Sequence, residues 1–273
     1  MKVMNRRKAL AITLTALMAM SAIAGCGQQE NAATSENTAT PTQNTKGTLR
    51  MATSADYPPY EFRDTASGKD EIIGFDVDIA NYIAKELGYK LEVSDTDFNG
   101  LIPALQTKRV DLVMAGMTPT EERKKNVDFS DIYYEAKNTL VAKKGTNFTK
   151  LEDLAGKRVG VQLGSTQETA IKDASKTIKG INMVSLNKIG EIIEEIKSNR
   201  IEAAVIEDTV AKGYTANNAD LVFNTIPSNP QEAGSAIAFP KGSEQVAGFN
   251  KVIRQMKENG ELEKLAKKWF EKK

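Results

Sequence analysis

One arginine in an expected helix start has the clearest chemistry in this sequence. The stretch AGMTPTEERKKNVDFS (115–130) follows an apolar run, and we expect a buried strand over residues 110–115. Thr118 suits an N-cap, Pro119 suits the first helical position, and Glu121 completes a Thr-x-x-Glu capping box. Arg123 lies one turn into this helix, near its free N–H groups, and a guanidinium binds a carboxylate through two parallel hydrogen bonds. The stretch predicts an anion site, although a solvated helical face is the alternative and the one we expect for Lys124 and Lys125.

A second helix start has a similar pattern. In VGVQLGSTQET (159–169) a short apolar strand ends at Gln162, and Ser165 and Glu168 form another capping box. Gly164 allows close approach of the backbone, so N–H groups around Thr166 could bind an anion. The two stretches together favour one anion held between two helix N-termini.

The residue types that are missing from the sequence exclude several kinds of chemistry. There is no histidine, and Cys26 is the one cysteine. Ser-His-Asp and Cys-His catalysis and His/Cys zinc sites are therefore excluded, and we find no Walker motif and no convincing Gly-x-Gly-x-x-Gly motif. We expect a binding protein rather than an enzyme, with no cofactor and no metal.

The first 47 residues have the composition of targeting and tether segments. Residues 1–25 combine four basic residues, an apolar run and a small-residue exit, as in a secretory signal peptide; a retained transmembrane helix is the alternative. The exit IAGC resembles the bacterial lipoprotein motif, which implies lipidation of Cys26 and a membrane anchor. Residues 26–47 are polar, lack aromatic residues and predict a flexible tether. Removal of residues 1–25 changes the net charge from +1 to −3, so we expect no nucleic-acid partner.

From residue 48 onward, short apolar runs alternate with helical patterns. An amphipathic helix is expected over residues 75–87, with Gly88 as its stop. The alternation predicts an α/β fold with mainly parallel sheets, in which ligands bind beyond the C-terminal strand ends. Residues 101–118 and 192–209 also align without a gap, which indicates either two related lobes or a chance likeness between helix–strand units.

Several stretches of the sequence resemble the extracellular solute-binding proteins, family 3, of amino-acid ABC importers. The resemblance covers residues 48–271 and is carried by ATSADYPPYEF (52–62), GFDVDIANYIAKELG (74–88), residues 97–134, KRVGVQLGSTQET (157–169) and IAFPKGS (237–243). It implies a periplasmic-binding-protein-like (Venus flytrap) fold of two α/β lobes. Lobe 1 would comprise residues 48–135 and 236–273 and lobe 2 residues 136–235, with a two-segment hinge near residues 135–139 and 231–235.

The resemblance also implies roles for individual residues. Tyr57 and Phe98 match aromatic walls, Gly116 and Thr118 match contacts to the α-amino group, and Arg123 and Thr166 match contacts to the α-carboxylate. The α-ammonium partner, an Asp in the family, aligns with Glu207, and we favour it over the neighbouring Asp208. The complete expected set is Ser54, Asp56, Tyr57, Phe98, Ala115, Gly116, Thr118, Arg123, Gln162, Gly164, Ser165, Thr166 and Glu207.

The identity of the ligand is left open by these residues. Several relatives carry Asp at the position of Ser54, whereas here Asp56 either caps a turn or offers a carboxylate to a basic side chain. We favour arginine, lysine or a similar cation. Glutamine or another polar amino acid is the alternative, since Gln162 suits an amide.

The resemblance implies a monomeric, extracytoplasmic protein that delivers a free amino acid to an ABC permease with its ATPase. A cyclohexadienyl dehydratase-like enzyme and the sensing half of a receptor are remoter alternatives.

Overall fold

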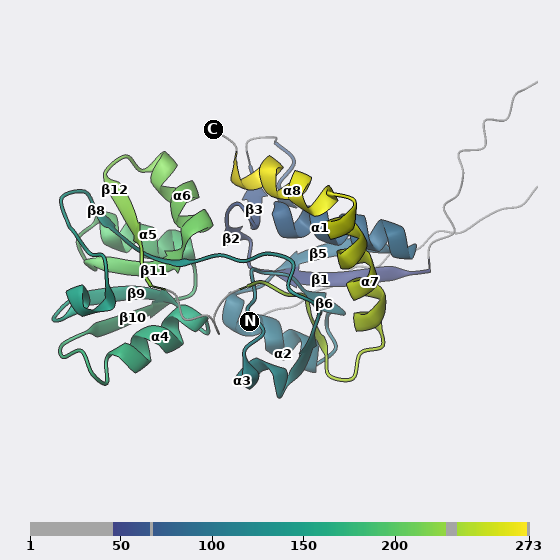
Figure 1. The fold of residues 1–273 in the computed structure, drawn as a ribbon, viewed down its shortest axis with the longest axis horizontal. Helices are drawn as coiled ribbons and strands as arrows, with labels where there is room; N and C mark the ends of the chain where they lie inside the picture. The colour runs from purple at the N-terminus through teal and green to yellow at the C-terminus, as the bar shows by residue number, and fades with distance from the viewer. Residues whose placement is uncertain (1–45, 66–67, 228–233, 272–273) are drawn as a thin grey trace, which may run out of the picture. The chain divides into compact units, whose positions relative to one another are not determined.

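The computed structural model describes residues 46–65, 68–227 and 234–271. This part of the chain forms two five-stranded sheets and one three-stranded sheet. We call the part built on the first five-stranded sheet lobe 1 and the part built on the second lobe 2 (Figure 1). The expected α/β class with two lobes is confirmed.

The first sheet has the order β5-β1-β6-β13-β7 and takes its strands from both ends of the described chain. Its strands are β1 (Thr48–Thr53), β5 (Lys90–Asp95), β6 (Leu112–Val113), β7 (Val127–Phe129) and β13 (Ala238–Pro240). β1 is parallel to β5 and β6, whereas β13 is antiparallel to β6 and β7. The three-stranded sheet consists of β2 (Asp56–Tyr57), β3 (Glu61–Asp64) and β4 (Glu71–Ile73).

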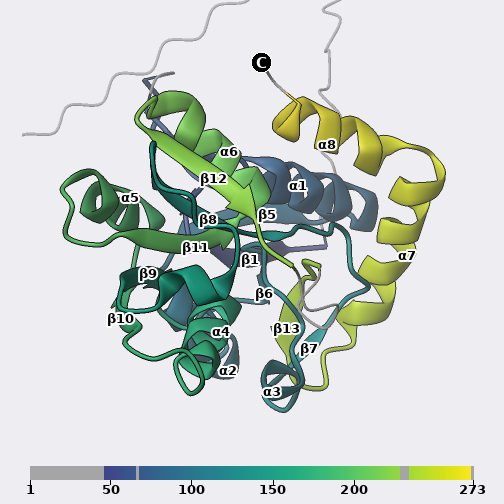
Figure 2. The same cartoon turned by 60° about the vertical axis from the view of Figure 1, so that its left-hand side comes forward.

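Lobe 1 also contains helices from both ends of the described chain. They are α1 (Phe75–Leu87), the 3₁₀ helix η1 (Phe98–Gly100), α2 (Leu101–Gln106), α3 (Glu121–Lys124), α7 (Gln245–Glu258) and α8 (Glu261–Phe270). α1 packs beside α7 and α8 (Figure 2). Its apolar residues Phe75, Ile79 and Ile83 are completely buried, and Gly88 ends it at a φ of 78°, as the sequence predicts.

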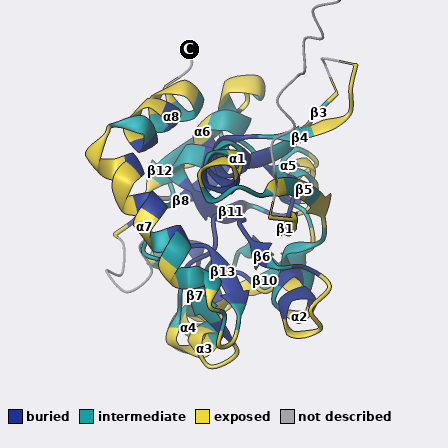
Figure 3. Cartoon of the chain, turned by 90° about the vertical axis from the view of Figure 1, so that its right-hand side faces the viewer, coloured by how far each residue is buried: buried dark blue, intermediate teal, exposed yellow. Residues whose placement is uncertain are grey.

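The second sheet has the order β10-β9-β11-β8-β12. Its strands are β8 (Asn138–Lys143), β9 (Arg158–Gln162), β10 (Asn182–Leu186), β11 (Ala203–Glu207) and β12 (Leu221–Thr225), and its helices are η2 (Leu151–Leu154), α4 (Thr166–Ala174), α5 (Ile189–Lys197) and α6 (Asp208–Asn217). β9 is parallel to β10 and β11, whereas β8 is antiparallel to β11 and β12. The buried strands contrast with the partly exposed helices α7 and α8 (Figure 3).

Each of the two aligned segments contains an acidic residue that is hydrogen-bonded to an arginine of its own lobe. We call this arginine–carboxylate pair the clip. In lobe 1, Arg50 binds Asp111 through its backbone N–H (2.8 Å) and its guanidinium (2.7 Å). In lobe 2, Arg158 binds Glu202, the residue aligned with Asp111, in the same two ways (2.7 and 2.5 Å). This shared clip favours related lobes over a chance likeness.

The backbone around the clip is repeated as well. Each arginine also donates to a carbonyl oxygen, of Lys108 in lobe 1 (3.2 Å) and of Asn199 in lobe 2 (2.9 Å). Both residues, which align with each other, have a positive φ, 56° and 59° respectively. Such a conformation is uncommon outside glycine, so its recurrence at aligned positions supports the same conclusion.

Two segments connect the lobes, and Tyr134 and Ser235 form an isolated antiparallel bridge between them. Within the described ranges, no helix has the length and apolar character required to span a bilayer. The expected signal peptide, Cys26 and all but residues 46 and 47 of the expected tether lie outside the described residues.

Gly74, immediately before α1, gives a test of the fold. It has a φ of 141°, and a Cβ there would lie 2.1 Å from the Tyr60 carbonyl oxygen. Gly74→Ala should lower the free energy of unfolding by about 3 kcal/mol or more, because the methyl group would collide with backbone.

Gly145 is the matched control, with a φ of 91° and nothing within 4 Å of the point that a Cβ would occupy. Gly145→Ala should therefore cost only the conformational part, about 1–2 kcal/mol. Urea unfolding measures both variants, and equal losses would contradict the steric argument.

Candidate functional site

Residues from both lobes line one small cavity at the ends of the strands. Lobe 1 contributes Tyr57, Phe98, Ala115, Gly116, Thr118 and Arg123, and lobe 2 contributes Gln162, Ser165, Thr166, Gln167 and Glu207. The cavity has a volume of about 10 Å³, comparable to one water molecule. Ten of the thirteen expected residues are among these, and Gln167 is an addition that we did not predict.

The location follows the strand topology. Ala115 and Gly116 follow β6, whereas Gln162 and Glu207 are the last residues of β9 and β11. These strands run parallel to their neighbours β1 and β10, so their carboxyl ends face the same edge of each sheet. The expected site at C-terminal strand ends is therefore where the cavity lies.

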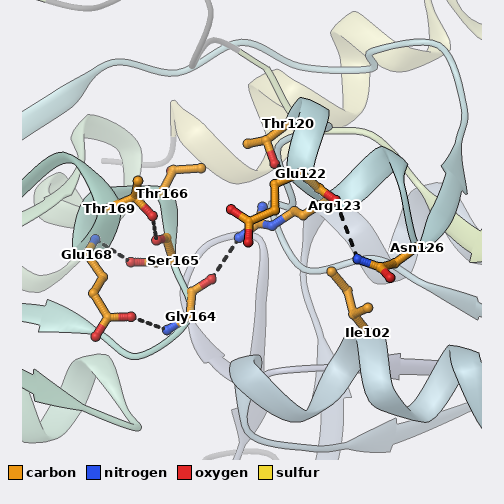
Figure 4. Close-up of a pocket in the computed structure, with 10 residues that line it drawn as sticks. All are labelled: Ile102, Thr120, Glu122, Arg123, Asn126, Gly164, Ser165, Thr166, Glu168 and Thr169. Atoms are coloured by element: carbon orange, nitrogen blue, oxygen red, sulfur yellow. Dashed lines mark hydrogen bonds between the residues drawn. The ribbon is translucent and has the colours of Figure 1, made fainter. Parts of the chain in front are cut away.

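Arg123 joins the two lobes through backbone carbonyls. Its Nη1 donates to the Thr118 carbonyl (2.9 Å). Its Nη2 donates to the Gly164 carbonyl of lobe 2 (2.9 Å) (Figure 4). The guanidinium carbon lies 5.3 Å from the centre of the Phe98 ring. Burial lowers the pKa of Arg123 to about 10, against the opposing effects of Glu122 and Glu207. The guanidinium is thus a partly desolvated cation whose hydrogen-bond acceptors are neutral.

The predicted cap of the helix that carries Arg123 is wrong. α3 begins at Glu121, and Thr120, not Thr118, is its N-cap, with its hydroxyl accepting from the Arg123 N–H (3.2 Å). The Thr118 carbonyl instead accepts the Thr120 N–H (3.0 Å), so residues 118–120 form a turn before the helix. The predicted strand over residues 110–115 is likewise shorter, since β6 comprises Leu112–Val113.

The second predicted helix start is confirmed. Ser165 is the N-cap of α4, and its hydroxyl accepts from the Glu168 N–H (3.0 Å). The Glu168 carboxylate accepts from the Gly164 N–H (2.7 Å) rather than from Ser165 (Figure 4). Gly164 has a φ of 78°, and a Cβ there would lie 3.1 Å from the Asn99 side chain of lobe 1. The glycine therefore allows the lobes to approach each other at this point.

A larger pocket of about 360 Å³ adjoins the cavity on this side. Arg123, Ser165 and Thr166 line both spaces, and Gly164 and Glu168 also line the larger one (Figure 4). Gly164, which does not line the small cavity, still binds Arg123 through its carbonyl. The pocket therefore continues outward from the guanidinium.

Glu207 is the acidic residue of the cavity. It is 9% exposed, and among the described residues its Oε2 has no hydrogen-bond partner. Burial raises the pKa of Glu207 to about 8, while the nearby hydroxyls of Tyr60 and Tyr57 oppose the rise. Asp208 does not line the cavity, because its Oδ1 accepts from the backbone N–H groups of Thr209 (2.8 Å) and Lys137 (3.3 Å). The geometry thus places Glu207, and not Asp208, beside the other cavity residues.

Ser54 and Asp56 do not line the cavity. The Ser54 hydroxyl donates to Asp56 Oδ1 (2.8 Å), while Asp56 Oδ2 accepts from the backbone N–H of Ile189 in lobe 2 (2.6 Å). Lys188 Nζ lies 3.7 Å from Asp56 Oδ1 and 3.1 Å from Asp97. Asp56 therefore neither caps a turn of its own lobe nor faces the cavity, and instead binds the first turn of α5.

Gln167, the lining residue that sequence reasoning missed, is the second residue of α4. Its Nε2 donates to Asn138 Oδ1 (2.9 Å) at the start of β8. Its position next to Thr166 in the first turn of α4 is the sequence feature that could have identified it as a lining residue. Within the described parts of the chain, no group of three or more acidic, cysteine or histidine side chains is arranged to hold a metal ion.

Comparison with known proteins gives consistent results. Residues 49–272 match the family described as bacterial extracellular solute-binding proteins, family 3. The chain is 53% identical over 226 residues to the arginine-binding extracellular protein ArtP of Bacillus subtilis (strain 168), covering 82% of this chain and 87% of that protein.

Solved structures of similar proteins share the fold. An ancestral arginine-binding protein bound to arginine has 43% identity and a TM-score of 0.77, with 83% of this chain and 99% of that chain covered. An ancestral arginine-binding protein bound to glutamine has 42% identity and a TM-score of 0.76, with 84% and 100% covered. The chain belongs to the bacterial extracellular solute-binding proteins, family 3.

Proposed function

We propose that this protein is the substrate-binding component of an amino-acid ABC importer and that it binds a free amino acid between its two lobes. The observation that carries this proposal is the presence of Arg123 and Glu207, from different lobes, at one cavity. An α-amino acid presents a carboxylate and an ammonium group, which these two side chains can bind as counter-charges. Charge-assisted hydrogen bonds of this kind are roughly twice as strong as neutral ones.

Arginine or another basic amino acid is the ligand that we favour. The relatives named for arginine binding support this choice, and the aromatic side chains of Tyr57 and Phe98 line the cavity and suit a guanidinium or ammonium group. Glutamine is the second candidate, supported by the glutamine-bound ancestral protein and by Gln162 and Gln167 at the cavity. Asp56 does not contribute to this choice, because it lies outside the cavity lining.

Binding requires the lining groups to move apart. A volume of about 10 Å³ does not accommodate an amino acid, so we propose that the lobes open and then close around the ligand. The hinge would be near residues 135–139 and 231–235, and residues 231–233 lie outside the described residues. The lobes would comprise residues 48–135 with 236–273 and residues 136–235. A ligand that contacts both lobes shifts the population towards the closed form.

The N-terminal segments complete the proposal. Residues 1–25 would direct export, lipid on Cys26 would anchor the protein to the outer face of the cell membrane, and residues 26–47 would be the tether. The closed form would then deliver its ligand to a membrane permease that a cytoplasmic ATPase drives.

Arg123→Ala tests the carboxylate contact. Loss of one partner of a buried charge pair costs about 2–5 kcal/mol, so the Kd for arginine should rise about 30-fold to several thousand-fold. The exposed Lys125 follows α3, and Lys125→Ala should leave the Kd unchanged. Calorimetry with arginine and glutamine measures both variants, and near-normal affinity in Arg123→Ala would contradict the proposal.

Proton release tests the role of Glu207. Because burial raises its pKa to about 8, Glu207 is mostly protonated at pH 7, and an ammonium ligand requires the carboxylate. Binding should therefore release a proton, and below pH 8 the affinity should rise up to about tenfold per pH unit. Calorimetry in buffers of different ionisation enthalpy measures the release.

Glu207→Gln should abolish this proton release, and Asp208→Asn should retain it. A wild-type protein that takes up or releases no proton on binding would exclude this role for Glu207.

The carboxyl group of Glu207 also affects stability in the absence of ligand. Because the pKa of Glu207 is raised in the folded state, its contribution to the free energy of unfolding is complete below the unfolded pKa. This contribution is lost as the pH rises through about 8.

Asp56→Ala tests the contact between the lobes. Loss of the Ile189 N–H acceptor and of the Lys188 ion pair should speed dissociation of arginine and glutamine equally, by about 3- to 30-fold. Asp173→Ala, at an exposed ion pair within lobe 2, should have no effect. Stopped-flow fluorescence measures the rates, and a loss confined to arginine would instead make Asp56 a contact for a basic side chain.

A further inference from the structure

Two acidic side chains in lobe 1 are completely buried beside each other, outside the cavity lining. Glu61 is the first residue of β3 and Asp76 the second residue of α1, and each is 0% exposed. Among the described residues, Glu61 Oε1, Glu61 Oε2 and Asp76 Oδ1 have no hydrogen-bond partner. Unpaired buried carboxyl oxygens are costly, so this arrangement requires an explanation.

The other oxygen of Asp76 is fully used. Asp76 Oδ2 accepts from the Gly116 N–H (3.0 Å) and from the Tyr133 hydroxyl (2.7 Å). These bonds stabilise the ionised form of Asp76. Two adjacent buried carboxylates would repel each other strongly, so a proton on Glu61 that is donated to Asp76 removes this repulsion. It also pairs Asp76 Oδ1 with one of the two Glu61 oxygens.

The surrounding charges favour retention of this proton. The charged groups that act on Glu61 are Asp76, Asp56 and Glu207, and the phenols of Tyr57 and Tyr133 also face it. Within the described residues, neither Glu61 nor Asp76 forms an ion pair with a basic side chain. Burial, followed by Asp76, raises the pKa of Glu61 well above its usual range.

The pKa of Asp76 is raised less than the pKa of Glu61. Burial raises the pKa of Asp76 to about 6, and the bonds from Gly116 and Tyr133 and the proximity of Glu61 limit the rise. Glu207 also interacts electrostatically with Asp76. The proton therefore belongs mainly to Glu61, and the negative charge belongs mainly to Asp76.

We propose that Glu61 and Asp76 share one proton and that this acid pair positions Gly116 for ligand binding. Gly116 and its neighbour Ala115 line the cavity, and the Gly116 N–H is bound directly by Asp76. Gly116 has a φ of 54°, and a Cβ there would lie 3.1 Å from the Tyr57 ring. The Asp76 carboxylate thus holds the peptide group between Ala115 and Gly116 in place under the aromatic wall.

The inference rests on the proposed function where it concerns ligand binding, but its first test needs no ligand. The Gly116 amide resonance of the ¹⁵N-labelled protein reports on its bond to Asp76. In the wild-type protein this resonance should shift at alkaline pH, when the shared proton is lost. In Glu61→Gln the amide group donates to Asp76 at every pH, so the resonance should stay near its neutral-pH position.

Asp76→Asn and Glu71→Gln complete the series. Asp76→Asn replaces a charged acceptor by a neutral one, so the Gly116 resonance should move even at pH 7. Glu71 is exposed on β4 of the same small sheet, and Glu71→Gln should behave as wild type. If Asp76→Asn does not fold, the pH titrations of the wild type and Glu61→Gln still decide the question.

The second test is the pH profile of arginine affinity. The ratio of the wild-type Kd to the Glu61→Gln Kd cancels the titration of arginine itself. It should rise by roughly threefold or more between pH 7 and about pH 10, since only the wild type loses the shared proton. A merely structural role of Glu61 would lower the melting temperature and leave this ratio constant.

The two tests distinguish the possible failures. A Gly116 resonance that responds as expected in a protein that binds no amino acid would overturn the proposed function and support the acid pair. A Gly116 resonance that is indifferent to pH and to both substitutions, in a protein that binds arginine, would overturn the acid pair alone.

Discussion

The hydrogen bonds of Arg123 to two backbone carbonyls of different lobes are the interaction on which the rest of the site depends. A guanidinium has five donors and stays charged in proteins, so burying it requires acceptors. Thr118 and Gly164 supply neutral acceptors, and Phe98 covers one face of the side chain. The lowered pKa of Arg123, about 10, indicates that these groups do not replace the lost hydration fully. A carboxylate would compensate this cation better than a carbonyl, which is why an anionic group of the ligand fits here.

The opposite imbalance exists among three buried acids, of which only Glu207 lines the cavity. Glu207, Glu61 and Asp76 are all buried, and burial raises the pKa of each carboxyl group. These acids lower the stability of the protein as the pH rises, because each must ionise in a place that disfavours charge. A loss of stability of this kind is typical of functional sites, where the ligand supplies the counter-charge that a buried group lacks. An ammonium group beside Glu207 would supply that charge.

Local features of the structure could be predicted from the sequence, whereas features that depend on the packing of the two lobes could not. α1 with its Gly88 stop and the Ser165 cap of α4 were predicted because their determinants lie within a few residues. The cap of α3 was predicted at Thr118 and found at Thr120. Thr118 has the Thr-x-x-Glu spacing and the following proline, whereas Thr120 has only the preferred residue type, and the turn at Thr118 delays the helix by two residues. The partner of Asp56 lies in the other lobe, 133 positions along the chain, so no local pattern could reveal it. The burial of Glu61 and Asp76 was equally invisible, although both residues stand in stretches that carry the family resemblance.

The contacts between the lobes determine how much a ligand can gain from closure. Asp56 with Ile189, the Tyr214 hydroxyl with the Asp56 carbonyl (2.9 Å), and Arg123 with Gly164 all link the lobes without involving a ligand. The first two can persist when a ligand is bound, because neither Asp56 nor Tyr214 lines the cavity. The third uses one N–H of Nη2, so a carboxylate that bound through this donor would replace the Gly164 carbonyl at Arg123. In that case the exchange at Arg123 would contribute only the difference between a charge-assisted bond and the neutral bond that it replaces, in addition to the closure contacts that the protein itself provides. A ligand shifts the equilibrium between the open and closed forms only by its differential affinity for the closed form. The strength of the Asp56 contact therefore helps to determine how much closed form exists without ligand. The exchange at Arg123 would contribute to how much more closed form the ligand produces.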